Sequence, residues 1–184
     1  MSDEATGVLR DEHRTILRVV GAFEGLLAGG GPAPGAQAER AAECVRFFRL
    51  FADLCHHAKE EDLLFDELVE AGFSREAGPV AVMLYEHTLA RGHVGAMAEE
   101  LDGVRSGDPG ALARFRQAAV DYIELIRAHI LKEDNVLFTM ADRALDAPAC
   151  ARLCEAYDEA CVRRFEGCTK SELEELAERI VGGD

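Results

Sequence analysis

The sequence predicts an all-α protein, an antiparallel up-down four-helix bundle with extra C-terminal helices. Three observations lead to this prediction: apolar residues recur at helical spacing, strand-like alternation of apolar and polar residues is absent, and two long segments of the chain repeat one another. Four helices joined by short connections pack as antiparallel neighbours. We therefore expect a bundle with an internal two-hairpin repeat over residues 1–145, and a helical extension packed on it over residues 146–184.

Glycine, proline and capping residues mark where the predicted helices begin and end. Asp108 followed by Pro109 is typical of an N-cap with proline in the first turn. Thr169 and Glu172, three residues apart, form a capping box. The predicted helices span approximately residues 8–28, 36–71, 79–104, 109–145 and 148–165, with a short sixth helix after Thr169.

Composition narrows the class of protein. The 184 residues carry 20 basic and 35 acidic side chains, a net charge of −15 that repels nucleic acid and anionic membrane surfaces. No apolar run reaches the roughly 18 residues that a membrane span needs, and the first residues do not resemble a signal peptide. Without a secretory signal, we expect a cytoplasmic protein whose cysteines are reduced and mostly pack in the interior. No Cys-x-x-Cys pair is present, so the sequence indicates neither a zinc knuckle nor a thioredoxin-type redox site. Three of the cysteines lie seven residues apart on one helical face: Cys154, Cys161 and Cys168.

An internal repeat locates a candidate site. Residues 56–65 and 129–138 both read His-x-x-Lys-Glu-acid-(Asp/Asn)-aliphatic-Leu-Phe, without a gap. A Glu-His pair precedes each segment, at 12–13 and at 86–87, and the two histidine-to-histidine separations are 43 and 42 residues. The chain therefore reads as two helical hairpins related by a pseudo-two-fold axis, each of which supplies the same residues.

The repeated residue types favour a dinuclear metal centre. A histidine and a glutamate four residues apart lie on one helix face, and helix bundles build carboxylate-bridged metal pairs from such inward-facing side chains. Nitrogen and oxygen ligands without thiolate favour iron or manganese over structural zinc. His57 aligns with Ile130 in the repeat, so we expect it only to flank the site. The predicted ligands are His13, His56, Glu60, His87, His129 and Glu133.

These residues resemble the hemerythrin-like family of HHE cation-binding domains. The likeness covers residues 8 to 140 and includes the run Cys-His-His-Ala-Lys-Glu-Glu-Asp-Leu-Leu-Phe that begins at Cys55. The resemblance implies an oxo- or hydroxo-bridged pair of iron ions, in preference to manganese or zinc, held by the same six ligands. It implies that a small oxidant or gas (dioxygen, peroxide or nitric oxide) binds at an open dinuclear site, with catalase-like or oxidase activity as an extension. The alternative is a non-enzymatic oxygen or redox sensor or an iron-handling module, and a homodimer is compatible with either.

Two departures from the oxygen-carrying members matter. Arg91 stands where those proteins have a second histidine on the third helix, as in a bacterial His-x-x-x-Arg subgroup, and arginine cannot ligate a metal. Arg91 could instead donate hydrogen bonds to a bound anionic ligand or form an outward salt bridge. Asp134 is the alternative to Glu133 as the last ligand. Tyr122, two turns before His129, is a candidate to line the pocket or to pack, and His93 should face elsewhere.

Overall fold

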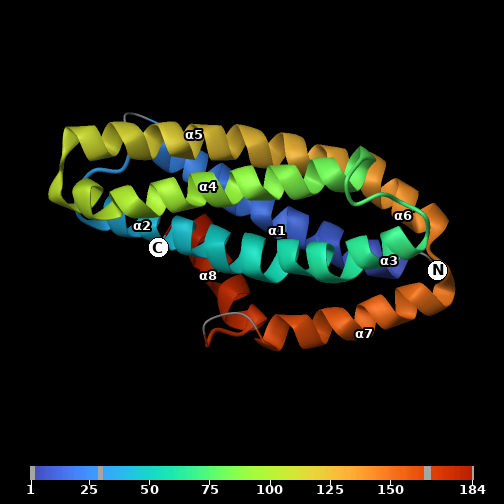
Figure 1. Ribbon diagram of the computed structural model, residues 1–184. Helices are drawn as coiled ribbons and strands as arrows, with labels where there is room; N and C mark the ends of the chain where they lie inside the picture. The colour runs from blue at the N-terminus through green and yellow to red at the C-terminus, as the bar shows by residue number, and fades with distance from the viewer. Residues whose placement is uncertain (1–2, 29–30, 164–166, 184) are drawn as a thin grey trace.

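The computed structural model describes residues 3–28, 31–163 and 167–183, and within these ranges the regular structure is entirely helical (Figure 1). The all-α prediction is therefore confirmed for the described part of the chain. Long helical runs lie side by side along the molecule; α7 runs roughly along them at one edge, and α8 crosses them. The elements, in chain order, are α1 (Asp3–Leu27), α2 (Ala36–Phe47), η1 (Phe48–His57), η2 (Glu60–Leu64), α3 (Phe65–Glu70), α4 (Gly78–Ser106), α5 (Pro109–Lys132), η3 (Glu133–Leu137), α6 (Phe138–Ala144), α7 (Ala147–Arg163) and α8 (Lys170–Gly182).

The capping signals act where the sequence places them. The Asp108 carboxylate accepts a hydrogen bond of 2.8 Å from the Gly110 backbone N–H at the start of α5. Thr169 and Glu172 form the reciprocal capping box of α8. The predicted helix boundaries agree with the observed ones within a few residues, apart from the end of the fifth helix at Phe165, which lies outside the described residues.

Two of the long helical runs, residues 36–70 and 109–144, contain π-helical segments, which the sequence pattern did not predict. These segments are η1 and η2 in the second run and η3 in the fourth. The last two begin at Glu60 and Glu133, which are equivalent positions of the repeat. A π-helix has i→i+5 hydrogen bonds and is frequent at functional sites, because the extra residue in the turn changes the direction of the side chains. The irregularity therefore falls on the segments that carry the candidate ligands.

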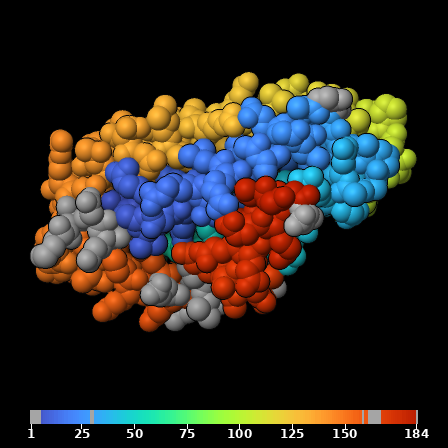
Figure 2. Space-filling model, turned by 180° about the vertical axis from the view of Figure 1, so that it is seen from behind, coloured from blue at the N-terminus to red at the C-terminus, as the bar shows by residue number. Residues whose placement is uncertain are grey.

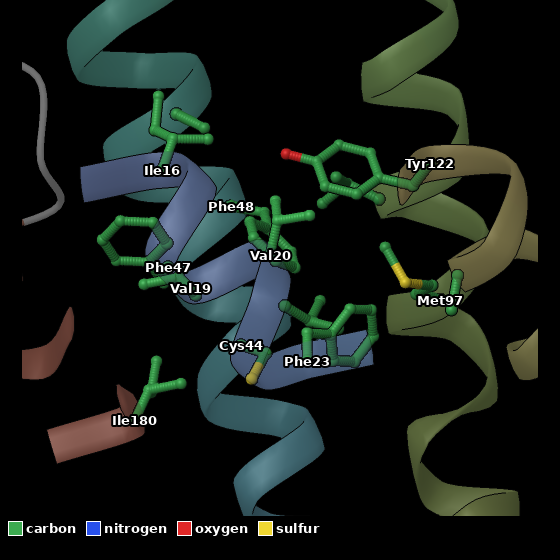
Figure 3. Packing of buried hydrophobic residues seen from close by; sticks show 14 of the residues in the cluster. Ile16, Val19, Val20, Phe23, Cys44, Phe47, Phe48, Met97, Tyr122 and Ile180 are labelled. Atoms are coloured by element: carbon green, nitrogen blue, oxygen red, sulfur yellow. The ribbon is translucent and has the colours of Figure 1, made fainter. Parts of the chain in front are cut away.

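The apolar core has two parts, one on each side of a polar layer. The larger part lies among α1, α2, η1, α4, α5 and α8 and contains Phe23, Phe48 and Met97 (Figure 3). The smaller part contains Phe65, Phe138 and Tyr157 near the opposite end. Close to the loop between α4 and α5, a Cβ on Gly103 would lie 2.3 Å from the Ala111 Cβ, so glycine permits these helices to approach.

The C-terminal helices cover one side of the bundle. Helix α8 packs against α1, α2 and η1, and α7 packs against α1 and η2. Figure 2 shows α8 lying against α1 on this face. Among the described residues, no helix has both the length and the apolar composition that crossing a bilayer requires. The extension therefore covers the elements that supply the first hairpin of the repeat.

Candidate metal centre

Two groups of buried side chains meet in the polar layer between the two parts of the core. Within each group, one potential ligand atom from every residue lies within 4.8 Å of the others. Each of these side chains is at most 2% exposed. All of the sequence-predicted ligands are therefore brought together, and His57 joins them. The first group is His13, His56, Glu60 and Glu133, and the second is His57, Glu60, His87 and His129.

The two carboxylates lie between the histidines. Glu60 reaches His56 Nε2 with Oε1 at 3.5 Å and His87 Nε2 with Oε2 at 3.4 Å. Glu133 Oε2 lies 3.2 Å from His13 Nε2 and 3.1 Å from His129 Nε2. Each carboxylate thus contacts one histidine from each hairpin, which is the arrangement that a bridge between two cations requires.

The outward ring nitrogens of four histidines each face a carboxylate oxygen. Because an ionised carboxylate only accepts hydrogen bonds, the Nδ1 atom carries a hydrogen, so each imidazole in its neutral form presents the Nε2 lone pair to the centre. Metal-binding histidines are typically oriented in this way. The Nδ1-to-oxygen pairs are His13 with Asp134 at 2.9 Å, His56 with Glu12 at 3.0 Å, His87 with Glu61 at 2.7 Å and His129 with Glu86 at 2.9 Å.

These outer carboxylates obey the same pseudo-two-fold relation. Glu12 also binds Lys59, and Glu86 also binds Lys132. The other two carboxylates cross between hairpins, since Asp134 of the second holds His13 and Glu61 of the first holds His87. All of these residues belong to the repeat, although the sequence predicted only its histidines and the first glutamate of each segment as ligands, with Asp134 as the alternative to Glu133. Their duplication was the signal that could have identified them.

Many polar atoms at the centre have no hydrogen-bond partner among the described residues. They include Nε2 of His13 and His56, both ring nitrogens of His57, and both carboxylate oxygens of Glu60 and Glu133. The Nε2 atoms of His87 and His129 face one another at 3.1 Å. Leaving so many buried polar atoms unpaired is costly, and cations bound among them would satisfy them. The residues present therefore fit a metal pair.

Electrostatics separates the two central carboxylates. Burial and the neighbouring Glu133 raise the pKa of Glu60 well above its ordinary value. Burial also opposes charge on Glu133, but His129 and His13 hold its pKa well below the ordinary range. Burial opposes charge on His129 as well, yet Glu133 raises its pKa to about 9. Without a metal, the surroundings thus disfavour negative charge on Glu60 and stabilise it on Glu133, and added positive charge would favour the ionised form of both.

Comparison with known proteins agrees with this geometry. A family model described as the hemerythrin HHE cation binding domain matches residues 4–141. The chain belongs to the hemerythrin HHE cation-binding domain family. No curated protein and no solved structure matches it. The matched HHE domain contains both groups of side chains and ends before α7 begins. Helices α7 and α8 therefore lie outside the residues that the family model matches.

The structure corrects the expected role of His57 in this HHE domain. Its side chain is 2% exposed, its ring stacks on that of His87 with a centroid distance of 3.9 Å, and its Nδ1 lies 3.5 Å from Asp53 Oδ1. The expectation that it only flanks the site followed from the repeat, which aligns it with Ile130, whereas the structure brings it among the candidate ligand atoms. His57 ends the π-helical segment η1, so both it and His56 face inward.

Arg91 and Asp134 both act outside the central group of ligand atoms. Arg91 is 39% exposed, and its guanidinium donates to Asp53 and to Glu61, each at 2.7 Å. Arg91 thus forms a salt bridge, one of the two roles expected from the sequence. The salt bridge holds Asp53 next to His57 and Glu61 next to His87. Asp134 is 32% exposed and contacts His13 Nδ1, whereas Glu133 is fully buried between the histidines. The geometry thus favours Glu133 as the inner carboxylate.

The remaining candidates occupy peripheral positions. Tyr122 packs on Phe48 with a centroid distance of 4.6 Å, and its buried hydroxyl has no partner among the described residues. His93 is half-buried and lies in neither group. Both groups are free of cysteine within the described part of the chain, and the side chain of Cys161 lies outside it.

Proposed function

We propose that this HHE domain holds a dinuclear iron centre that binds a small oxidant or gas. The observation that carries the proposal is the convergence of unpaired, buried imidazole nitrogens and carboxylate oxygens from both hairpins. The first metal position would be held by His13 and His56, the second by His57, His87 and His129, with Glu60 and Glu133 bridging. We further propose that the four long helical runs form the antiparallel, up-down bundle expected from their short connections.

The ligand types support iron. Imidazole and carboxylate donors without thiolate suit iron or manganese better than a structural zinc site. Two octahedral ions offer about twelve positions, and five imidazoles with two bridging carboxylates fill about nine, so positions remain for an exogenous ligand. A bound iron pair would supply redox chemistry and Lewis acidity. The protein's own contribution is to fix each imidazole through its outer carboxylate and to exclude bulk water from the centre.

Iron loading tests the proposal. Metal-free protein would be reconstituted anaerobically with ferrous iron, exposed to oxygen, and examined by elemental analysis and absorption spectroscopy. We expect about two iron ions per chain and a near-ultraviolet to visible charge-transfer band. Peroxide turnover that is lost in Glu60→Ala would identify an enzyme rather than a carrier. Absence of stoichiometric metal in protein expressed with ample iron would refute the proposal.

A sensing or iron-handling module is the second candidate, and one contact favours it. Lys170 Nζ of α8 lies 2.8 Å from Glu12 Oε1, and Glu12 contacts His56 Nδ1. The C-terminal extension is thereby connected to the first metal position, so the metal state could alter how these helices dock. Tight iron binding without peroxide turnover, together with iron-dependent protease protection of α7 and α8, would select this function.

A further inference from the structure

A cavity of about 220 Å³ opens between η1 and helices α4 and α5. His57 lies in its lining, together with Phe48, Arg91, Val94, Gly95 and Tyr122. About 10–15 Å³ of such volume is enough to hold one water molecule. The cavity is therefore far larger than dioxygen, nitric oxide or hydrogen peroxide needs, although it reaches a residue of the second metal group.

The lining combines apolar walls with a few polar groups. Phe48 and Val94 supply apolar surface, and the Tyr122 ring packs on Phe48. The Tyr122 hydroxyl is buried without an intramolecular partner among the described residues, so it can donate to or accept from a molecule in the cavity. His57 provides the second polar group of the lining: its Nδ1 lies 3.5 Å from Asp53 Oδ1, and neither ring nitrogen forms a hydrogen bond among the described residues.

The charges near the cavity indicate a neutral occupant. Three charged side chains line the cavity: Arg49, Asp53 and Arg91. The Arg91 guanidinium is paired with Asp53 and with Glu61, each at 2.7 Å, and Arg49 is not an unpaired cation either. An organic anion would need an unpaired positive charge to replace its hydration. A neutral molecule with an apolar body and one polar end matches the lining, since small-molecule pockets typically combine apolar walls with a few polar contacts.

We propose that this cavity binds a small neutral organic molecule that carries one hydroxyl group on an apolar body, with the hydroxyl hydrogen-bonded to Tyr122 beside His57. The inference rests on the proposed function in one respect, namely that His57 belongs to the metal centre. It adds a class of organic ligand to the small gases and oxidants considered above.

Two glycines of α4 provide a matched test, with phenol as the probe. A Cβ at Gly95 or at Gly92 would meet no atom within 4 Å, but only Gly95 lines the cavity. Calorimetric titration of phenol into iron-loaded and metal-free protein should show binding to both. Gly95→Leu should weaken phenol binding at least about tenfold, because the new side chain occupies the cavity. Gly92→Leu should leave it within about twofold, since both substitutions increase helix propensity equally.

Tyr122→Phe separates the hydroxyl contact from the apolar walls. Phenol should bind about tenfold more tightly than toluene to the wild type, and this preference should vanish in Tyr122→Phe. Failure of phenol to bind the wild type, or equal affinity in Gly95→Leu, would overturn the assignment. Failure of the proposed function can be distinguished from failure of this assignment. In that case the protein would retain no iron, whether or not phenol binds in the cavity of the metal-free protein.

Discussion

The two halves of the repeat supply equivalent residues but differ in their surroundings. In the first half Glu12 and Lys59 are 3% and 1% exposed, and α8 adds Lys170 to Glu12. In the second half Glu86 and Lys132 are 13% and 42% exposed. The difference comes from the C-terminal helices, which lie outside the residues that the family model matches and pack mainly against α1, α2, η1 and η2 of the first half. The outer ion pair of the first half is thus covered by the C-terminal helices, whereas the equivalent ion pair of the second half is partly exposed to solvent.

The central carboxylates show the same asymmetry in their charge. Glu133 contacts two histidines that stabilise its negative charge, whereas Glu60 lies among further carboxylates that disfavour one. Glu60 and Glu133 occupy equivalent positions of the repeat, but their tendencies to ionise differ. The reason is that the charged groups around each of them come from other parts of the chain. Substitutions at matched positions should reveal this difference.

The largest expected effect distinguishes Glu133 from Glu60 in the metal-free protein. Glu133→Gln should lower the free energy of unfolding by about 3–5 kcal/mol, because it leaves the charges of its histidine partners unpaired. Glu60→Gln should change it by less than about 1 kcal/mol, because the glutamine replaces a group whose charged form its surroundings disfavour. Urea unfolding of both variants measures the difference, and equal losses would contradict the assigned charges.

The pH dependence of the Glu60 variant provides a second check. A folded-state pKa raised above the unfolded value contributes stability at low pH that is lost as the pH rises through the folded-state pKa. As the pH rises above the ordinary range of a carboxyl pKa, metal-free wild type should therefore lose more stability than Glu60→Gln. Parallel pH profiles would show that Glu60 is ionised in the metal-free fold.

His57 tests whether the second metal position differs from the first. His57→Gln should weaken metal binding at least about 100-fold at one position, reducing retained iron from about two to about one per chain after exhaustive dialysis. His93→Gln is the control, because His93 lies in neither group. Retention of both metals and an unchanged spectrum in His57→Gln would return this residue to the flanking role.

The smallest expected effect compares the lysines of the two outer networks. Lys170→Met should cost about 1 kcal/mol of unfolding free energy, because a partly buried contact with Glu12 is lost. Lys132→Met should cost less than about 0.5 kcal/mol, because Lys132 is 42% exposed and water can replace it at Glu86. Chemical denaturation of the metal-free variants provides the measurement. A larger loss in Lys132→Met would show that covering by α8 does not strengthen this contact.

Much of the fold and of the central residue set could be predicted from the sequence. Asp108, Thr169 and the glycine-rich loops set helix boundaries through local interactions, which a linear sequence records directly. The duplicated His-x-x-x-Glu spacing identified His56, Glu60, His129 and Glu133 because four residues make about one turn of helix.

The remaining features depended on information that spacing does not contain. His57 ends η1, which is π-helical rather than α-helical. No residue pattern in the sequence predicted this segment. The position of Arg91 between Asp53 and Glu61 depends on how two runs pack against each other. The contribution of Lys170 could not be inferred because it arises from the docking of α8 more than a hundred residues after Glu12.

The crossed carboxylates have a consequence for how the molecule opens. Asp134 of the second hairpin orients His13 of the first, and Glu61 of the first orients His87 of the second. Neither hairpin therefore builds a complete binding position by itself, and separating them dismantles both positions at once. Bound metal should make the two hairpins a single unit of hydrogen exchange, with the slowest amides of α1 and α4 becoming exposed to solvent together.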